Sequence, residues 1–341
     1  MAPFAALMGL SLAFQSLPDL CNLFDASCIS HLSLKTNENG VRGVFVDDEV
    51  PPGMTVLQIP IKACLRDDEA PLESGEWPVR MASCLLNLRK NEDKTEAQQV
   101  WLDLLPTDLS KSLPIHWDES LVRSCQSTDL ELAVDSSYFV RADAMTQLQD
   151  CFPSERDCQD ALDIVQTRSC RVEPGIRLLA PIFDLLNHGG NHANAEFLRI
   201  DEHLVVRTTR QVEAGSELLI DYGESARPAW KCLLSYGFVP TNDDMAELLV
   251  DGMRYSVGPE SIPYELVEAV SAKFGQTEVD LSLAVCNFLA DCAEQITNNN
   301  DNESDDQEPP SRAAHLATDL RQSQRHALVA FARGLREYHA V

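Results

Sequence analysis

Two short apolar runs joined by a proline–glycine turn open the patterned part of the chain. The turn-rich segment 39–43 precedes the apolar residues 44–46, and Pro-Pro-Gly at 51–53 separates these from the apolar-rich run 54–60. Short β-rich runs divided by turn residues are typical of strands. The pattern therefore predicts two strands and a turn in this segment.

From about residue 79 the apolar positions change to helical spacing. A methionine and several leucines recur at roughly helical intervals between residues 81 and 88, and a second run over 100–105 stops at Pro106. This spacing, ended by proline, indicates amphipathic helices. We expect the region as far as about residue 165 to be mainly helical.

Strand and helix patterns both return in the second half of the chain. Strands are predicted at 177–182, 203–208 and 216–222, and helices at 262–274, 281–296 and 312–338. The segment 298–310 has five acidic residues, no basic residue and no large apolar residue. Such a segment cannot bury enough apolar surface to fold, so it is predicted to be a disordered acidic linker.

The order of these elements indicates an α+β fold. Two β-rich segments, at about 39–60 and 176–222, flank a helical insertion, and a helical C-terminal part follows. A doubly wound nucleotide-binding fold would instead alternate strands and helices regularly. The chain also lacks both glycine-rich phosphate-loop patterns that are typical of nucleotide-binding folds.

Composition and charge narrow the class of partner. The chain has 341 residues, 44% of them hydrophobic, and a formal net charge of −27. The hydrophobic content predicts a core of ordinary size. The negative charge argues against a protein that binds nucleic acid or anionic lipid, because such a protein needs a basic patch. The charge permits a basic protein partner, and we expect a monomer.

The cysteines and the N-terminal segment give expectations about metal binding and cellular location. The eleven cysteines are irregularly spaced without a CxxC pair, which favours free thiols in a reducing compartment and no metal site. Residues 1–17 are apolar with no preceding basic residue, which favours an arm or a helix over a signal peptide. No later segment is long and apolar enough for a membrane span. We expect a cytoplasmic protein, with a nuclear or plastid location left open.

Polar residues embedded among apolar neighbours mark the segment 179–239 as the most informative part of the chain. They include Asp184, the pair Asn187-His188, and Tyr222. Buried polar groups must find hydrogen-bond partners or a ligand. The residues alone leave two readings open, namely a core with satisfied polar groups or a binding site.

These residues resemble the SET domain of protein methyltransferases. The similarity is to the Rubisco large-subunit methyltransferase-like branch, which includes actin-histidine methyltransferase relatives. Its motifs occur in family order as Val41-Arg42-Gly43-Val44, Trp101 to Pro106, Thr167-Arg168-Ser169, Pro181 to His188, Ile220 to Gly223 and Tyr236 to Val239. Val41 departs from the glycine that is usual at the first position. The similarity covers roughly residues 30–240.

The resemblance implies a division into domains. Residues 1–29 form an N-terminal arm, and residues 30–240 form a split, β-rich SET domain with its helical insertion at about 78–165. Residues 241–341 form a smaller helical domain that resembles, more faintly, the substrate-docking domain of the family. The alternative for this last domain is a structural cap. No cysteine-rich zinc segment follows the SET motifs.

The resemblance also implies a cofactor and roles for individual residues. The cofactor is S-adenosylmethionine, held by Arg42, Gly43, Arg168, Asn187 and His188. Glycine at position 43 suits a close backbone approach, and a guanidinium at position 168 suits the carboxylate of the cofactor. Tyr222 is the catalytic candidate. The residues expected on the substrate side are Asp184, Tyr236 and Phe238, although Asp184 has the alternative role of anchoring its loop.

The leading hypothesis for the activity is methylation of a lysine side chain in a non-histone protein. Methylation of a histidine nitrogen is the second enzymatic reading. A SET-like interaction module without turnover is the third. The predicted partner is a protein segment that bears lysine or histidine, and the sequence does not identify it.

Overall fold

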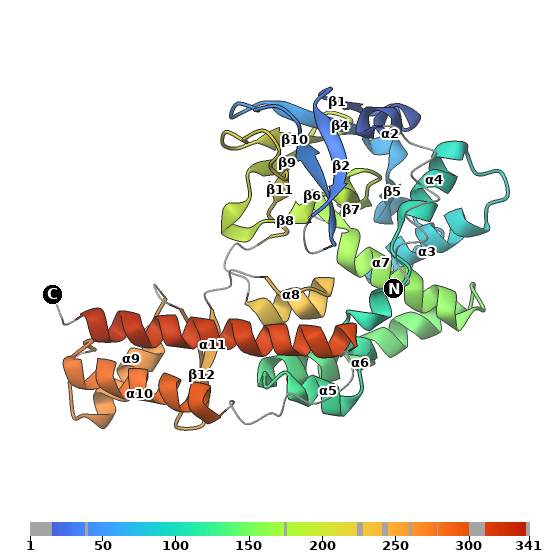
Figure 1. The fold of residues 1–341 in the computed structure, drawn as a ribbon. Helices are drawn as coiled ribbons and strands as arrows, with labels where there is room; N and C mark the ends of the chain where they lie inside the picture. The colour runs from blue at the N-terminus through green and yellow to red at the C-terminus, as the bar shows by residue number, and fades with distance from the viewer. Residues whose placement is uncertain are drawn as a thin grey trace. The chain divides into compact units, whose positions relative to one another are not determined.

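The computed structural model describes most of the chain (Figure 1). The described residues are 16–37, 40–173, 176–223, 228–240, 245–258, 261–277, 279–299 and 311–338. The predicted acidic linker lies outside them from residue 300 to residue 310, and so does the chain before residue 16.

The chain divides into two compact units. The first contains residues up to 107 and residues 140–226, and the second contains residues 108–139 and 227–341. This division differs from the boundaries drawn from the sequence, because part of the predicted insertion belongs to the second unit and the second unit begins before residue 240. Of the predicted N-terminal arm, residues 17–28 are folded into the first unit as a helix and a short strand.

A six-stranded sheet forms the centre of the first unit. Its order is β1 (Ser27–Cys28), β4 (Thr55–Pro60), β10 (His203–Thr208), β9 (Ala195–Ile200), β11 (Leu219–Ile220) and β8 (Asn187–His188). The neighbours β4, β10 and β9 are antiparallel, whereas β11 runs parallel to β8 and β9. The predicted strands at 54–60 and 203–208 are confirmed, and the strand predicted at 216–222 is shorter.

Two smaller sheets complete the β structure of this unit. β2 (Leu32–Thr36) pairs antiparallel with β3 (Arg42–Val46), and β7 (Ile176–Leu179) lies between β5 (Leu65–Arg66) and β6 (Cys170–Glu173). Val44 and Val46 of β3 are fully buried. Apolar residues on alternate positions of a strand face the same side, so β3 directs these two valines into the core.

The first unit contains helices on both sides of its sheets in the sequence, and one of them begins with a complete capping box. They are α2 (Leu17–Leu23), α3 (Trp77–Lys90), α4 (Glu96–Leu104) and α7 (Glu155–Arg168), and α6 (Thr128–Gln149) runs from the second unit into the first. At the start of α4, Thr95 accepts a bond from the backbone of Gln98, whose side chain accepts one from the Thr95 N–H. This capping box satisfies two backbone donors that the helix itself leaves unpaired.

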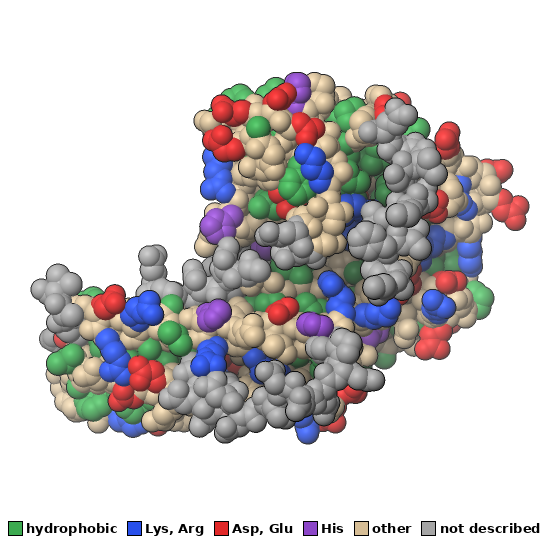
Figure 2. Space-filling view, viewed as in Figure 1, with side chains coloured by type: hydrophobic (Ala, Val, Ile, Leu, Met, Phe, Trp, Pro, Cys, Tyr) green, Lys and Arg blue, Asp and Glu red, His purple; other side chains and the backbone are tan. Residues whose placement is uncertain are grey.

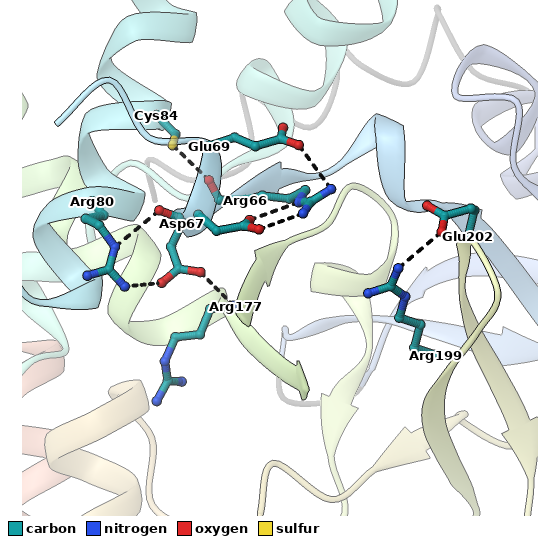
Figure 3. Close-up of polar contacts among 9 residues, drawn as sticks. Arg66, Asp67, Glu69, Arg80, Cys84, Arg177, Arg199 and Glu202 are labelled. Atoms are coloured by element: carbon teal, nitrogen blue, oxygen red, sulfur yellow. Dashed lines mark hydrogen bonds and ion pairs between the residues drawn. The ribbon is translucent and has the colours of Figure 1, made fainter. Parts of the chain in front are cut away.

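A buried carboxylate fastens α3 to the β5–β7–β6 sheet (Figure 3). Asp67 is almost fully buried and accepts bonds from the Arg80 Nη2 at 2.7 Å and from the backbone N–H of Arg177 at 2.8 Å. Buried charges are tolerated where they are paired and hydrogen-bonded. The contacts of Asp67 therefore tie the start of the helical insertion to the strand that follows it.

The second unit is mainly helical, with one hairpin. Its elements are α5 (Glu119–Ser124), α8 (Ala229–Tyr236), β12 (Ala246–Val250), β13 (Met253–Val257), α9 (Tyr264–Lys273), α10 (Leu283–Asn299) and α11 (Arg312–Tyr338). One apolar core lies between the hairpin and α9, α10 and α11, and it includes the fully buried Phe331. In this unit α10 and α11 lie side by side (Figure 1). The α+β class and the helical C-terminal part are thus confirmed.

A second apolar core in this unit explains the boundary within the predicted insertion. Trp117, Val122 and Leu130 from the insertion pack with Leu233 of α8 and Leu320 of α11. The hairpin β12–β13 was not predicted from the sequence. It turns at Asp251-Gly252, and both residues have positive φ values, 52° and 81°.

Acidic and basic side chains both occur on the face shown in Figure 2, in each of the two units. All eleven cysteines are free thiols. In the part of the chain that the structure describes, no helix is long and apolar enough to cross a membrane.

Candidate functional site

The strand β8 places Asn187 and His188 beside the strand that leads to Tyr222. Asn187 lies opposite Leu219 and His188 lies opposite Ile220 in the parallel pairing of β8 with β11. Because both strands run in the same direction, the residues that follow them emerge at the same edge of the sheet. Tyr222 therefore leaves its strand next to His188.

His188 and Tyr222 are joined by a backbone hydrogen bond. The backbone N–H of Tyr222 donates to Nδ1 of His188 at 3.1 Å, and the two rings lie 5.2 Å apart between centroids. A nitrogen that accepts a bond carries no proton, so the neutral ring has its proton on Nε2. The nearby Asp221 carboxylate, 3.8 Å from Nδ1, is then a close contact and not a salt bridge.

The hydroxyl of Tyr222 points back to the same loop. It donates to the backbone carbonyl of Leu186 at 2.6 Å. An O–H group that donates one bond still offers two lone pairs as acceptors. The Tyr222 oxygen can therefore accept a hydrogen bond from an incoming N–H group.

The side-chain amide of Asn187 reaches β3. Its Nδ2 donates to the backbone carbonyl of Arg42 at 2.8 Å and to Oε1 of Glu217 at 2.6 Å. Glu217 was not among the residues singled out in the sequence. It pairs with Phe45 in an isolated bridge, and the following residue donates its N–H to Val44. The chain therefore passes from pairing with β3 to pairing with β8 within a few residues.

Position 43 requires glycine because the side chains of Glu217 and Asn187 lie against its backbone. A Cβ atom on Gly43 would lie 2.0 Å from Oε1 of Glu217 and 2.9 Å from Nδ2 of Asn187. Such distances are far below van der Waals contact, so any side chain at position 43 would displace at least one of these two groups. The close approach expected at this glycine is an approach of the protein's own side chains.

Asp184 is a buried carboxylate between two arginines. Arg168 Nη1 donates to the backbone carbonyl of Asp184 at 2.5 Å, and Trp101 Nε1 donates to its Oδ2 at 3.5 Å. Burial raises the pKa of Asp184, and the charges of Arg168 and Arg42 oppose that rise. These contacts tie the loop before β8 to α4 and α7.

Arg42 is also held by protein groups. Its Nη2 donates to the backbone carbonyl of Leu104 at 2.9 Å, and burial lowers the pKa of its guanidinium. Two buried polar atoms of the cluster, Nε of Arg168 and Oδ1 of Asp184, have no hydrogen-bond partner among the described residues. Buried polar atoms without partners are uncommon, so they indicate a ligand or water.

A strained turn precedes the Asp184 loop. Ile182 has φ 69° and ψ −45°, and the N–H of Phe183 bonds to the carbonyl of Pro181 at 2.8 Å. This is a classic γ-turn, which is rare and costly for a β-branched residue. Ile182 is nonetheless almost fully buried, so its packing holds the loop in this conformation.

The structure brings together seven of the nine residues predicted for the site. Hydrogen bonds and ionic interactions link them within the first unit: Arg42, Gly43, Arg168, Asp184, Asn187, His188 and Tyr222. Tyr236 and Phe238 belong to the second unit, where Tyr236 is the last residue of α8 and Phe238 follows that helix, and their rings stack with centroids 6.1 Å apart. No group of three or more metal-ligating side chains occurs within the described ranges.

Comparisons with known proteins identify the family and the fold of the chain. A family model described as SET domain matches residues 41–223, which is more than half of the chain. The N-lysine methyltransferase setd6 of Xenopus laevis is 44% identical over 81 residues. That match covers 23% of this chain and only 17% of that protein.

Solved structures share the fold over the whole chain. The structure entitled "Crystal structure of the SET domain of LSMT bound to Lysine and AdoHcy" has a TM-score of 0.64 at 13% identity, with 100% of this chain and 93% of that chain covered. "Structure of Rubisco LSMT bound to Sinefungin and Monomethyllysine" has a TM-score of 0.63 at 14% identity, with the same coverage. At this identity the likeness establishes the fold.

Proposed function

Because the chain belongs to the SET domain family, we propose that it is an S-adenosylmethionine-dependent protein methyltransferase that acts on lysine. The observation that carries the proposal is the single set of contacts that joins Gly43, Asn187, His188 and Tyr222. Lysine is favoured because the relative from Xenopus laevis is an N-lysine methyltransferase, and because two of the similar structures are bound to lysine or monomethyllysine.

The polar atoms of the site fit the amino-acid end of this cofactor. Among the residues that the structure describes, Nε of Arg168 is a buried donor with no hydrogen-bond partner, which suits a carboxylate. Within the same residues, Oδ1 of Asp184 is a buried acceptor with no such partner, which suits an ammonium group. We propose that Arg168, Asn187 and His188 hold the cofactor. Because the guanidinium of Arg42 is bonded to Leu104, the contribution of Arg42 and Gly43 would be through their backbone.

The chemistry requires a neutral amine. S-adenosylmethionine supplies a methyl group on a sulfonium sulfur, and transfer to an amine lone pair leaves a neutral thioether. A lysine with an ordinary pKa of about 10.4 must lose its proton first, which costs about 4–5 kcal/mol at pH 7. The apolar surroundings of the site, with Leu185 and Leu186 buried, reduce that cost because burial favours the neutral amine.

Tyr222 orients the amine in this mechanism. Its hydroxyl proton is held by the carbonyl of Leu186, so its oxygen acts as an acceptor toward an N–H of the substrate. A phenol with an ordinary pKa of about 10 is a poor base at neutral pH. Positioning is the larger contribution, since misplacement of reacting atoms by about 1 Å can cost about 100-fold in rate. The substrate-side roles of Asp184, Tyr236 and Phe238 stay predictions.

Two measurements test the proposal. Calorimetric titration with S-adenosylmethionine should show binding by the wild type, and mass spectrometry of a peptide array should locate the added methyl group on lysine. Tyr222→Phe should lower the transfer rate about 100-fold and leave the affinity for S-adenosylmethionine nearly unchanged. Tyr264→Phe makes the same chemical change at an exposed position of α9 and serves as the control.

Three outcomes would contradict parts of the proposal. Absence of cofactor binding would refute the enzymatic function as a whole. Methylation that maps to histidine would refute the choice of lysine. A wild-type transfer rate for Tyr222→Phe would refute the role of the hydroxyl.

A further inference from the structure

Glu217 stands where two strands of the proposed cofactor site meet. The residue before it accepts a backbone bond from Val46, and the residue after it donates one to Val44. Two residues later the same chain pairs with Asn187 in the register of β8 and β11. The side chain of Glu217 is half-buried, and it extends toward the amide of Asn187 and not toward bulk solvent.

The partners of Asn187 determine which way its amide points. The backbone carbonyl of Arg42 and the carboxylate of Glu217 are both acceptors only, so the NH₂ end of the amide must face them. The carbonyl oxygen Oδ1 is then the end of the amide that is left to accept a bond from elsewhere. An ammonium or amino group of a bound ligand is a donor that matches this orientation.

The Arg42 carbonyl and the Glu217 carboxylate together hold the Asn187 amide more firmly than either group would alone. A single carbonyl uses one of the two N–H bonds, whereas a carboxylate adds a charge-assisted bond, which is stronger than a neutral one. The Glu217 bond is also the shorter of the two, at 2.6 Å against 2.8 Å.

The glycine at position 43 leaves room for this contact. The nearest atoms to a Cβ built on Gly43 are Oε1 and Cδ of Glu217, at 2.0 Å and 2.8 Å, and the next is Nδ2 of Asn187. The bond between Glu217 and Asn187 therefore passes directly over the missing side chain. Three residues from separate segments of the chain form one interlocking contact.

We propose that Glu217 is a positioning residue that fixes the Asn187 amide so that its carbonyl oxygen accepts a bond from S-adenosylmethionine. This inference rests on the proposed function. Glu217 does not itself contact S-adenosylmethionine, and it acts through Asn187. Its removal should weaken the binding of cofactor more than it slows methyl transfer at saturating cofactor.

The test is calorimetric titration with S-adenosylhomocysteine on the full chain. Glu217→Ala and Glu217→Met should each weaken binding about tenfold. Met fills the space of the side chain and so keeps the test usable if the alanine variant does not fold. Glu217→Gln should bind within about threefold of the wild type, because its amide oxygen can still accept from Asn187. Glu213→Ala changes an exposed glutamate in the preceding turn and serves as the matched control.

A double-mutant cycle shows whether Glu217 acts through Asn187. In the Asn187→Ala background, Glu217→Met should have no further effect on binding, since residues in one network are not additive. Kinetics should show a raised KM for S-adenosylmethionine with kcat within about twofold. A merely structural role would give additive losses, a similar loss for Glu217→Gln, and lower kcat.

The outcomes separate the two proposals. If the wild type binds and Glu217→Met binds equally well, the role of Glu217 is refuted and the proposed function stands. Additive losses of affinity in the double-mutant cycle also refute the role of Glu217 and leave the proposed function standing. If the wild type does not bind S-adenosylhomocysteine, both the proposed function and the role of Glu217 are overturned.

Discussion

Glu247 in the second unit provides a test of the structure that does not depend on function. Its carboxylate accepts a bond from the buried Ser127 hydroxyl at 3.2 Å and lies 3.6 Å from Nη1 of Arg254. Its side chain is 17% exposed. Burial, followed by the interaction with the neighbouring Asp129 carboxylate, raises the pKa of Glu247 from 4.5 to about 7, against smaller opposing effects of Ser127 and Arg254.

This pKa makes stability depend on pH with a definite sign. Below pH 4.5 the carboxyl is protonated in both the folded and the unfolded chain, so there is no difference. Between pH 4.5 and 7 the unfolded chain releases its proton while the folded chain keeps it, so the free energy of unfolding falls. Above pH 7 the loss is complete, and a difference of 2.5 pKa units corresponds to about 3 kcal/mol.

Glu247→Gln should remove this loss. The glutamine resembles the protonated acid, because its amide can accept from Ser127 and donate to Asp129. The lost ion pair with the partly exposed Arg254 costs at most about 1 kcal/mol. We therefore expect Glu247→Gln to be about 2–3 kcal/mol more stable than the wild type at pH 8 and no more stable at pH 4.5.

Urea unfolding followed by far-UV circular dichroism, at half-unit intervals between pH 4.5 and 8, measures this difference. Asp129→Asn should lower the pKa of Glu247 and shrink the pH-dependent gain, since it removes the like charge. Glu268→Gln changes an exposed position of α9 and should give the same small effect at every pH. A gain from Glu247→Gln that does not vary with pH would refute the reasoning.

Three further predictions follow from individual contacts. Gly43→Ala should weaken cofactor binding about tenfold in calorimetry, because its Cβ displaces Glu217 from Asn187, and the loss should become smaller in a Glu217→Ala background, where only the contact with Asn187 remains; equal losses in both backgrounds would contradict this. Phe331→Ala should cost about 3–5 kcal/mol in urea unfolding, since the ring is fully buried in the core of the second unit; an unchanged midpoint would contradict the packing. Arg141→Met should cost about 3 kcal/mol because it leaves the buried Asp163 without the arginine 2.6 Å away; a neutral effect on the thermal midpoint would show that this ion pair does not stabilise the fold.

Long, regular elements were predictable from the sequence. The run 203–208 matches β10, and the helix predicted at 312–338 matches α11. In these segments the apolar residues recur at one period over several residues, so the local pattern and the tertiary packing agree.

Short elements and nonlocal packing were not predictable in the same way. The hairpin β12–β13 was missed, although Asp251-Gly252 between two β-rich runs is the usual signal of a type I′ turn. The boundary within the helical insertion could not be found from the pattern. It depends on Trp117 and Leu130 packing with helices that come more than a hundred residues later in the chain.

The site likewise contains residues that could be predicted from the sequence and one that could not. Asn187, His188 and Tyr222 stood out because they lie in motifs that resemble a family. Glu217 lies in the strand predicted at 216–222 and looked like any polar residue of a half-exposed strand. The role proposed for Glu217 depends on its contact with Asn187, thirty residues away, and on the absence of a side chain at Gly43. Neither of these can be seen in the local sequence pattern.

The direction of one hydrogen bond favours an orienting role for Tyr222 over a role as general base. A tyrosine that accepted a bond from the loop could transfer its own proton, whereas Tyr222 donates its proton to the carbonyl of Leu186 at 2.6 Å. Ionising this hydroxyl would lose that bond and leave a phenolate against a carbonyl oxygen, so a role as general base is disfavoured. In the proposed reaction the amine must therefore lose its proton to solvent, as its apolar surroundings lower its pKa, and Tyr222 receives the neutral amine as a hydrogen-bond acceptor. His188 supports this arrangement because it holds the backbone of Tyr222 from the strand that also carries Asn187.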